Sequence, residues 1–190
     1  MLLQSDEREL IRRCQLGDRD AFGALFDRYE RPVYRYAYHI LGDPDEADDI
    51  KQDTFVKAYR TLPGFRGECS LLTWLLKVAG NLCRDKIKSR SRRSETGLVP
   101  EIEATLFDRG SYGADPALEM ERKETTTAVH RVLNGLPQPQ REIIVLRDLQ
   151  GLSYQEIAQV LECSVASVKL RLFRARRGFK DRFESLTNTR

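Results

Sequence analysis

Apolar residues recur with helical spacing along almost the whole chain. Between Phe22 and Ile40 the apolar positions are three or four residues apart, as they are on one face of an amphipathic helix. Similar stripes run through residues 71–82, 129–136 and 165–183. The alternation of apolar and polar residues that is typical of a half-buried strand does not compete with this pattern. The sequence therefore predicts an all-α fold.

Residues that favour helix starts and breaks divide these stripes into separate helices. Asp6, with a glutamate three residues later, predicts the N-cap of a first helix. Pro32 lies inside the next stripe, where we expect it to kink or split the helix. Asp43 followed by Pro44 is typical of a helix start, and Ser70 is expected to cap a further helix. The first half of the chain is therefore expected to be a bundle of short helices.

The segment from about residue 92 to residue 116 interrupts the helical pattern. Serine, glycine and proline accumulate there, and between residues 94 and 121 seven acidic residues face a single base, Arg109. Such a composition is typical of an extended linker. The sequence thus predicts two small helical domains, residues 1–91 and 117–190, joined by an acidic flexible linker over residues 92–116.

Charge is distributed in blocks, although the formal net charge is only +3. Residues 84–93 hold six bases and one acid, and residues 168–182 hold seven bases and one acid. Residues 43–53 hold six acids and one base. Two basic surfaces favour contacts with nucleic acid, and a separate acidic surface favours a contact with a protein. For each block the alternative is a solvated helix face.

The composition excludes several classes of protein. Hydrophobic residues make up 41% and charged residues 32% of the 190 residues, which suits packed domains rather than a disordered chain. No apolar run approaches the roughly 20 residues of a membrane span, and the N-terminus lacks the apolar core of a signal peptide. We therefore expect a cytoplasmic protein without membrane insertion.

The sequence offers no group of residues typical of a metal, cofactor or catalytic site. The four cysteines form no CxxC pair, and the two histidines, His39 and His130, lie alone within helical stripes. Neither a P-loop nor an HExxH motif is present. We therefore expect no metal, no cofactor and no enzymatic activity, which argues against a nucleic-acid enzyme.

The strongest local signal lies in residues 151–180, GLSYQEIAQVLECSVASVKLRLFRARRGFK. Ser153 and Glu156 predict a capping box on a short helix, which a tight turn joins to a longer basic helix, as in a helix-turn-helix. The second helix of this motif enters the major groove of DNA. The residues expected to meet base edges are Lys169, Leu170, Phe173 and Arg174. The residues expected to bind phosphates are Arg171, Arg176 and Arg177. A core position is the alternative for Phe173.

Two segments of the chain together resemble the extracytoplasmic-function sigma factors, which belong to the sigma-70 family of promoter-specificity subunits of bacterial RNA polymerase. The segment GLSYQEIAQVLECSVASVKLRLFRAR is similar to region four of that family. The segment DPDEADDIKQDTFVKAYRTLPGFRGECSLLTWLLKVAGNLCRDKIKSR is similar to region two. The resemblance implies a helical bundle of region two followed by a helix-turn-helix of region four.

The resemblance also implies roles for residues of the first domain. The helix from Asp45 to Leu62 would dock on the clamp of the largest polymerase subunit. Its contact residues would be Asp48, Asp49, Gln52, Asp53, Phe55 and Tyr59. The loop and helix that follow would hold a flipped-out base of the minus-ten element and the strand beside it. Their contact residues would be Phe65, Arg66, Ser70, Asn81, Arg84, Lys86, Lys88 and Arg90. Trp74 belongs to the apolar stripe, so we expect it in the core; stacking on DNA is the alternative.

The resemblance implies a subunit that binds core polymerase, recognises the minus-thirty-five and minus-ten elements and promotes promoter melting. The genes that it serves would belong to a stress response. Its partners would be the polymerase clamp, the flap of the second largest subunit, promoter DNA and an anti-sigma factor. The alternative is a stand-alone helix-turn-helix regulator. Such a regulator would not need an acidic helix followed by a basic helix that contains a tryptophan.

Overall fold

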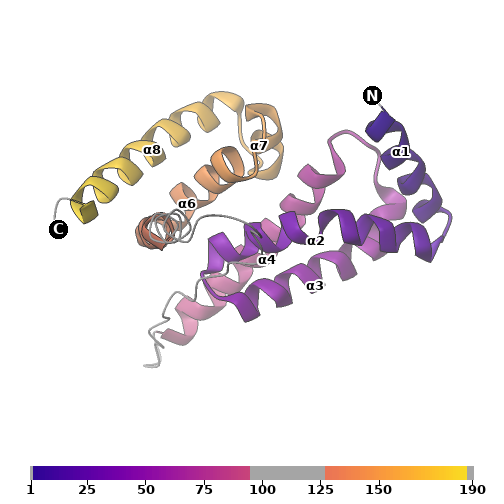
Figure 1. Ribbon diagram of the computed structural model, residues 1–190, viewed down its shortest axis with the longest axis horizontal. Coiled ribbons are helices and arrows are strands. Elements are labelled where there is room, and N and C mark those ends of the chain that lie inside the picture. Colours follow the sequence, from indigo (N-terminus) through magenta and orange to yellow (C-terminus); the bar gives the residue numbers. More distant parts are fainter. Residues whose placement is uncertain (1, 95–126, 188–190) are drawn as a thin grey trace, which may run out of the picture.

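The computed structural model describes residues 2–94 and 127–187, and every regular element within them is helical, which confirms the all-α expectation (Figure 1). The N-terminal domain consists of α1 (Leu2–Gln15), α2 (Arg19–Leu41), α3 (Pro44–Thr61), the 3-10 turn η1 (Leu62–Gly64) and α4 (Leu71–Ser94). The C-terminal domain consists of helical residues 127–135, α6 (Gln138–Ile144), the π-helical turn η2 (Val145–Leu149), α7 (Tyr154–Val160) and α8 (Val165–Thr187). The predicted linker lies outside the described residues except for its start, where α4 continues to Ser94. The predicted start of the second domain, at residue 117, also lies outside the described residues.

The N-terminal domain is a bundle in which α2 packs against α1, α3 and α4. The apolar stripe of α2 is buried, and Val33 within it is fully enclosed. Asp43 caps α3, since its carboxylate accepts the backbone N–H of Glu46 at 2.9 Å. Ser70 caps α4 in the same way, because its hydroxyl accepts the N–H of Thr73 at 3.1 Å. Both caps confirm helix starts that the sequence predicts.

The expected start of the first helix is wrong, and Pro32 does not split the second. α1 begins at Leu2 rather than at Asp6, and the Asp6 carboxylate instead accepts a hydrogen bond from Arg28 at 2.6 Å. α2 runs through Pro32 as a single helix. Buried residues of α2 on both sides of the proline hold the helix against its neighbours, which offsets the backbone hydrogen bond that the proline removes.

The C-terminal domain is built around the predicted helix-turn-helix. Ser153 and Glu156 form the expected capping box of α7: the Ser153 N–H donates to the Glu156 carboxylate at 2.9 Å, and the Glu156 N–H donates to the Ser153 hydroxyl at 3.2 Å. α8 packs on α6 and α7 and buries Val168, Leu172 and Ala175. The inward stripe that the sequence predicts for this helix is therefore confirmed over its central turns.

The two domains pack against each other and share one continuous apolar core. α7 lies on α4, while α6 and η2 lie on α2, so that the C-terminal domain (orange to yellow) sits beside the N-terminal bundle (Figure 1). Arg141 on α6 donates to the backbone carbonyl of Ile40 at 2.8 Å. Lys77 on α4 forms an ion pair of 2.7 Å with Glu162 in the turn after α7. We call this packing of the domains the closed arrangement.

Glu142 on α6 is the buried polar centre of the closed arrangement, with only 3% of the residue exposed. Its carboxylate accepts hydrogen bonds from Tyr36 Oη on α2 at 2.8 Å, from Arg84 Nη1 on α4 at 2.5 Å and from Gln138 Nε2 at 2.7 Å. Burial raises the pKa of Tyr36 well above its usual value, so its hydroxyl remains a donor. Breaking a buried ion pair by removing one partner costs about 3–5 kcal/mol.

Gly80 on α4 leaves no room for a side chain beside this centre. A Cβ at position 80 would lie 2.8 Å from Tyr36 Oη and 3.2 Å from Glu142 Oε1, whereas a Cβ at Gly23 on α2 would meet nothing within 4 Å. Replacing glycine by alanine inside a helix usually stabilises a protein by about 0.5–1 kcal/mol. We expect this gain for Gly23→Ala, but a loss of about 1–3 kcal/mol for Gly80→Ala, because the methyl group overpacks the centre. Urea denaturation measures both changes, and a stabilised Gly80→Ala variant would contradict the described packing.

Candidate functional site

α8 exposes a face that is both basic and apolar. Every residue predicted to contact the minus-thirty-five element is exposed: Lys169, Leu170, Arg171, Phe173, Arg174, Arg176 and Arg177. Phe173 is 67% exposed and Leu170 is 51% exposed, so Phe173 is not a core residue. Arg176 is tied to Asp148 by a hydrogen bond of 2.5 Å. Val165, which the stripe predicts to face inward, is 36% exposed because it starts the helix at the edge of the core.

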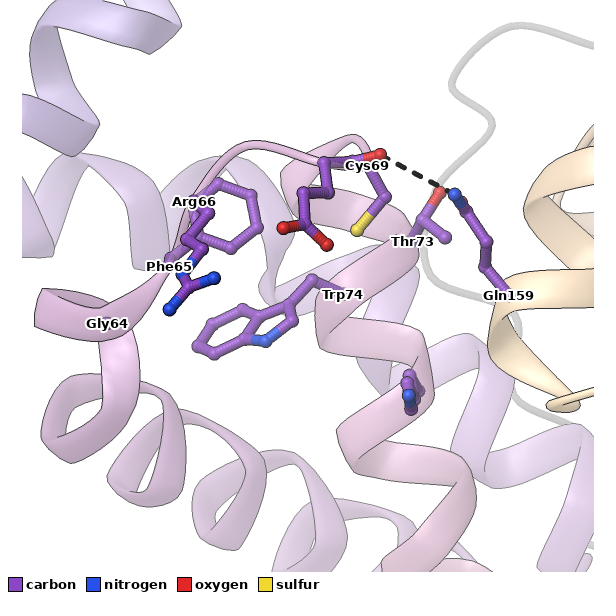
Figure 2. Close-up of a pocket in the computed structure, with 9 residues that line it drawn as sticks. Gly64, Phe65, Arg66, Cys69, Thr73, Trp74 and Gln159 are labelled. Carbon is purple, nitrogen blue, oxygen red and sulfur yellow. Dashed lines mark hydrogen bonds between the residues drawn. The ribbon is translucent and has the colours of Figure 1, made fainter.

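A pocket of about 460 Å³ lies between the loop after η1 and the first turns of α4 (Figure 2). Its walls include Arg66 and the rings of Phe65 and Trp74, whose centroids are 5.3 Å apart. Trp74 is half-buried: it packs against the hydrophobic core, as expected, and also lines the pocket. Gln159 of α7 lines another side and donates to the backbone carbonyl of Glu68 at 3.5 Å. Aromatic walls beside a guanidinium group suit a planar base that stacks.

Ser70, which the sequence predicts in the same site, lies at the start of α4 and contacts the C-terminal domain. Its hydroxyl and that of Thr73 donate to the carboxylate of Glu156 on α7 at 3.4 and 3.2 Å. Burial acts to raise the pKa of Glu156, but hydrogen bonds from Ser153, Thr73 and Ser70 outweigh it and lower that pKa. The C-terminal domain thus engages the edge of the predicted base-binding site.

Asn81 and Arg84 are brought together one turn apart on α4. Arg84 Nη2 donates to Asn81 Oδ1 at 2.5 Å, and the same guanidinium binds the buried Glu142. Asn81 itself is exposed, as is Lys88 on the same helix. In the closed arrangement Arg84 is therefore committed to a carboxylate, rather than available to a phosphate as the sequence predicts.

The basic block of α4 and the acidic block of α3 lie side by side. Lys86 Nζ is 3.6 Å from Asp49 Oδ2, and Arg90 Nε donates to Glu46 Oε1 at 3.1 Å. The expectation of a separate acidic surface is therefore wrong in part. Since α3 and α4 are neighbours in the bundle, their opposite charges pair along the seam between them.

α3 still presents an exposed face beyond this seam. Asp49, Gln52, Asp53 and Tyr59 are exposed, and Asp48 is half-buried. Hydrogen bonds from Lys51 and Gln52 lower the pKa of Asp48. Phe55, in contrast, is 4% exposed and packs on Phe26 with ring centroids 4.7 Å apart, so it supports α3 from inside rather than forming part of the exposed face.

Val56 belongs to the exposed face of α3 but was missed by the sequence analysis. It is 51% exposed, and the 46% exposed Tyr59 lies one turn further along the helix. The available signal was an apolar residue outside the buried series of this helix. None of the helices in residues 2–94 and 127–187 combines the length and the apolar character needed to cross a membrane.

Sequence profiles of two known domains match the chain. The profile of Sigma-70 region 2 matches residues 25–93, and the profile of Sigma-70, region 4 matches residues 126–177. The chain is 36% identical to the RNA polymerase sigma-H factor of Pseudomonas aeruginosa, over 93% of each chain. It is also 36% identical to the ECF RNA polymerase sigma-E factor of Escherichia coli K12, over 96% of this chain and 97% of the relative.

Solved structures have a similar fold. The sigma factor RpoE in complex with the anti-sigma factor NepR from Bartonella quintana gives a TM-score of 0.71 at 24% identity, over 86% of this chain and 96% of that chain. CnrH in complex with the cytosolic domain of CnrY gives a TM-score of 0.68 at 28% identity, over 95% of this chain and 98% of that chain. Both regions are matched in order, and more than nine-tenths of the chain aligns with curated relatives. The chain therefore belongs to the extracytoplasmic-function sigma factors of the sigma-70 family, the non-catalytic subunits that direct promoter recognition by bacterial RNA polymerase.

Proposed function

We propose that this sigma factor docks on core polymerase through α3, holds the minus-ten element with the pocket and α4, and reads the minus-thirty-five element with α8. The observation that carries the proposal is the outer face of α8, where basic side chains and large apolar side chains are exposed opposite a buried stripe. Recognition helices present such a face to the major groove. The protein would act in the cytoplasm, at promoters of stress-response genes.

The exposed residues of α8 divide into two groups: those that would contact base edges and those that would contact phosphates. Lys169 and Arg174 can donate to guanine edges, while Leu170 and Phe173 offer apolar contacts to a thymine methyl group. Arg177 and its basic neighbours suit phosphates, which position the helix on the duplex without reading sequence. The pairing of Arg176 with Asp148 limits its freedom to do so, unless a phosphate displaces the carboxylate.

At the minus-ten element the pocket would take an unstacked base. Its ring would stack against Phe65 and Trp74. Asn81, which lies further along α4 and is not among the residues that line the pocket, would offer an amide for edge hydrogen bonds. The basic side chains of α4 would bind phosphates of the same DNA strand. Because Arg84 and Ser70 are engaged by carboxylates of the C-terminal domain, the domains would have to separate before this strand enters.

On α3 the exposed acids Asp49 and Asp53 would face a basic clamp surface on the polymerase, and Val56 and Tyr59 would supply apolar area at the same contact. An anti-sigma factor is a further proposed partner, because both similar solved structures hold a second protein and one of them is named as an anti-sigma factor. Such a partner would favour the closed arrangement. A stand-alone helix-turn-helix regulator would leave the exposed face of α3 without a use.

Charge reversal on α3 tests the contact with polymerase. Asp49→Lys combined with Asp53→Lys is expected to weaken binding to core polymerase by about tenfold or more, because like charges would then meet at the clamp. Equilibrium binding to purified core enzyme measures the loss. Asp27→Lys, an exposed acid on α2, serves as the matched control and should bind normally. Equal binding by the α3 variant and this control would contradict the proposal.

Substitutions on α8 test the division between base and phosphate contacts. Arg174→Ala should cost about 1–3 kcal/mol at one base position and relax specificity there, whereas Arg177→Ala should weaken binding to all sequences alike and flatten the salt dependence. Leu170→Ser should reduce the preference for thymine at its position. Selection of holoenzyme-bound promoters from a library randomised over the minus-thirty-five element measures all three. An unchanged base preference for both Arg174→Ala and Leu170→Ser would contradict the proposed outer face.

A further inference from the structure

The two histidines of the chain meet across the domain contact. His39 lies near the end of α2, and His130 lies within helical residues 127–135 of the C-terminal domain. Their rings are stacked, with centroids 4.7 Å apart and planes inclined by 17°. Tyr38 lies beside both rings, at centroid distances of 5.9 and 5.4 Å. Since the chain has no further histidine, every imidazole of the molecule sits at this contact.

The surroundings disfavour a positive charge on either ring. Within the described residues His39 Nδ1 is buried without a hydrogen-bond partner. Burial, His130 and Arg35 lower the pKa of His39 to about 3, and burial lowers the pKa of His130. Arg141 on α6 fastens the same end of α2 to the C-terminal domain, since it donates to the carbonyl of Ile40, the residue after His39.

The neighbouring groups on α3 do not offset this. Lys51 lies over the ring of Tyr34 at 5.9 Å, and Tyr34 in turn stacks on Tyr38, but Lys51 is itself paired with Asp48 at 2.5 Å, so α3 brings a neutralised ion pair to this row of rings. Asp43, the acid that follows α2 in the chain, uses its carboxylate to cap α3. Within residues 2–94 and 127–187 the structure shows no ion pair or hydrogen bond between either imidazole and a carboxylate.

We propose that proton uptake by His39 and His130 opens the closed arrangement, so that the contact between the domains is a pH-sensitive switch. In the closed arrangement the stacked rings stay neutral, because burial disfavours a charge on either ring, and Arg35 and the second ring disfavour one on His39. In the open state each ring faces water. Opening would also release Arg84 and Ser70 for DNA; that consequence rests on the proposed function, whereas the opening itself does not.

The direction of the pH effect follows from linkage. The open state, in which each histidine has its ordinary pKa of about 6.5, takes up more protons than the closed state, so acidification favours opening. The effect begins as the pH falls below 6.5 and ends near pH 3, where His39 is protonated even in the closed arrangement. Between about pH 7.5 and about pH 5.5 the ratio of open to closed molecules should rise about tenfold through His39 alone, and further through His130, whose pKa is also lowered in the closed arrangement.

Single-molecule Förster resonance energy transfer in the full chain, without DNA, measures the populations of the open and closed states. The dyes are attached at Arg60→Cys on α3 and Lys180→Cys on α8, with Cys69 and Cys163 replaced by serine. An Arg141→Lys background keeps the positive charge at position 141 but loosens the hydrogen bond to the Ile40 carbonyl, which raises the open population into the measurable range at both pH values. We expect the ratio of open to closed molecules to rise at least about tenfold on acidification from about pH 7.5 to about pH 5.5.

The matched control replaces both histidines by phenylalanine, which keeps two flat rings in the contact but cannot take up a proton. Its ratio should change by less than about twofold over the same range. His130→Gln alone, which tests the pair without two new apolar rings, should show a smaller rise than the parent protein. An equal rise in the parent and the double variant, or no rise in the parent, would overturn the proposal. So would imidazole proton signals that titrate with an ordinary pKa in closed wild-type protein.

Discussion

The closed arrangement depends on one buried carboxylate that belongs to the C-terminal domain and finds two of its partners in the N-terminal domain. Glu142 is held by Tyr36 of α2 and by Arg84 of α4, in a space that Gly80 keeps free of a side chain. At low local dielectric these groups stabilise one another only while all are in place. A partly separated pair of domains would deprive the carboxylate of Tyr36 and Arg84 without hydrating it fully, so we expect closure to be close to all-or-none.

The same closure occupies the groups that recognise DNA in the proposed function. Glu142 holds Arg84, and Glu156 holds Ser70 and Thr73 at the edge of the base pocket. Both are carboxylates, so the C-terminal domain presents anionic oxygen atoms to donors that would otherwise meet a nucleic acid. A partner that binds only the open protein shifts the population toward it in proportion to its affinity. Docking on polymerase and exposure of the DNA-binding surface would therefore be coupled.

Local signals in the sequence predicted much of the fold and the outer face of α8, because caps such as those of Asp43 and Ser153 depend on residues three positions away. The closed arrangement could not be predicted in this way, since Tyr36 and Glu142 are 106 positions apart and no spacing rule relates them. Phe55 was assigned to a contact surface from the family resemblance, although Ile50 and Ala58 place it on the buried side of α3. The pairing of the two charge blocks depends on helix packing, which composition does not reveal.

A covalent lock on the closed arrangement tests the central claim, that the domains must separate for promoter recognition. Lys77 and Glu162 join the domains by an ion pair of 2.7 Å, which a carbodiimide would convert into an amide bond. Cross-linked protein added to core polymerase is predicted to produce no promoter-dependent transcript. The Lys77→Arg variant keeps the ion pair but forms no such bond, so after the same treatment it should remain active. Full transcription by the cross-linked protein would contradict the account.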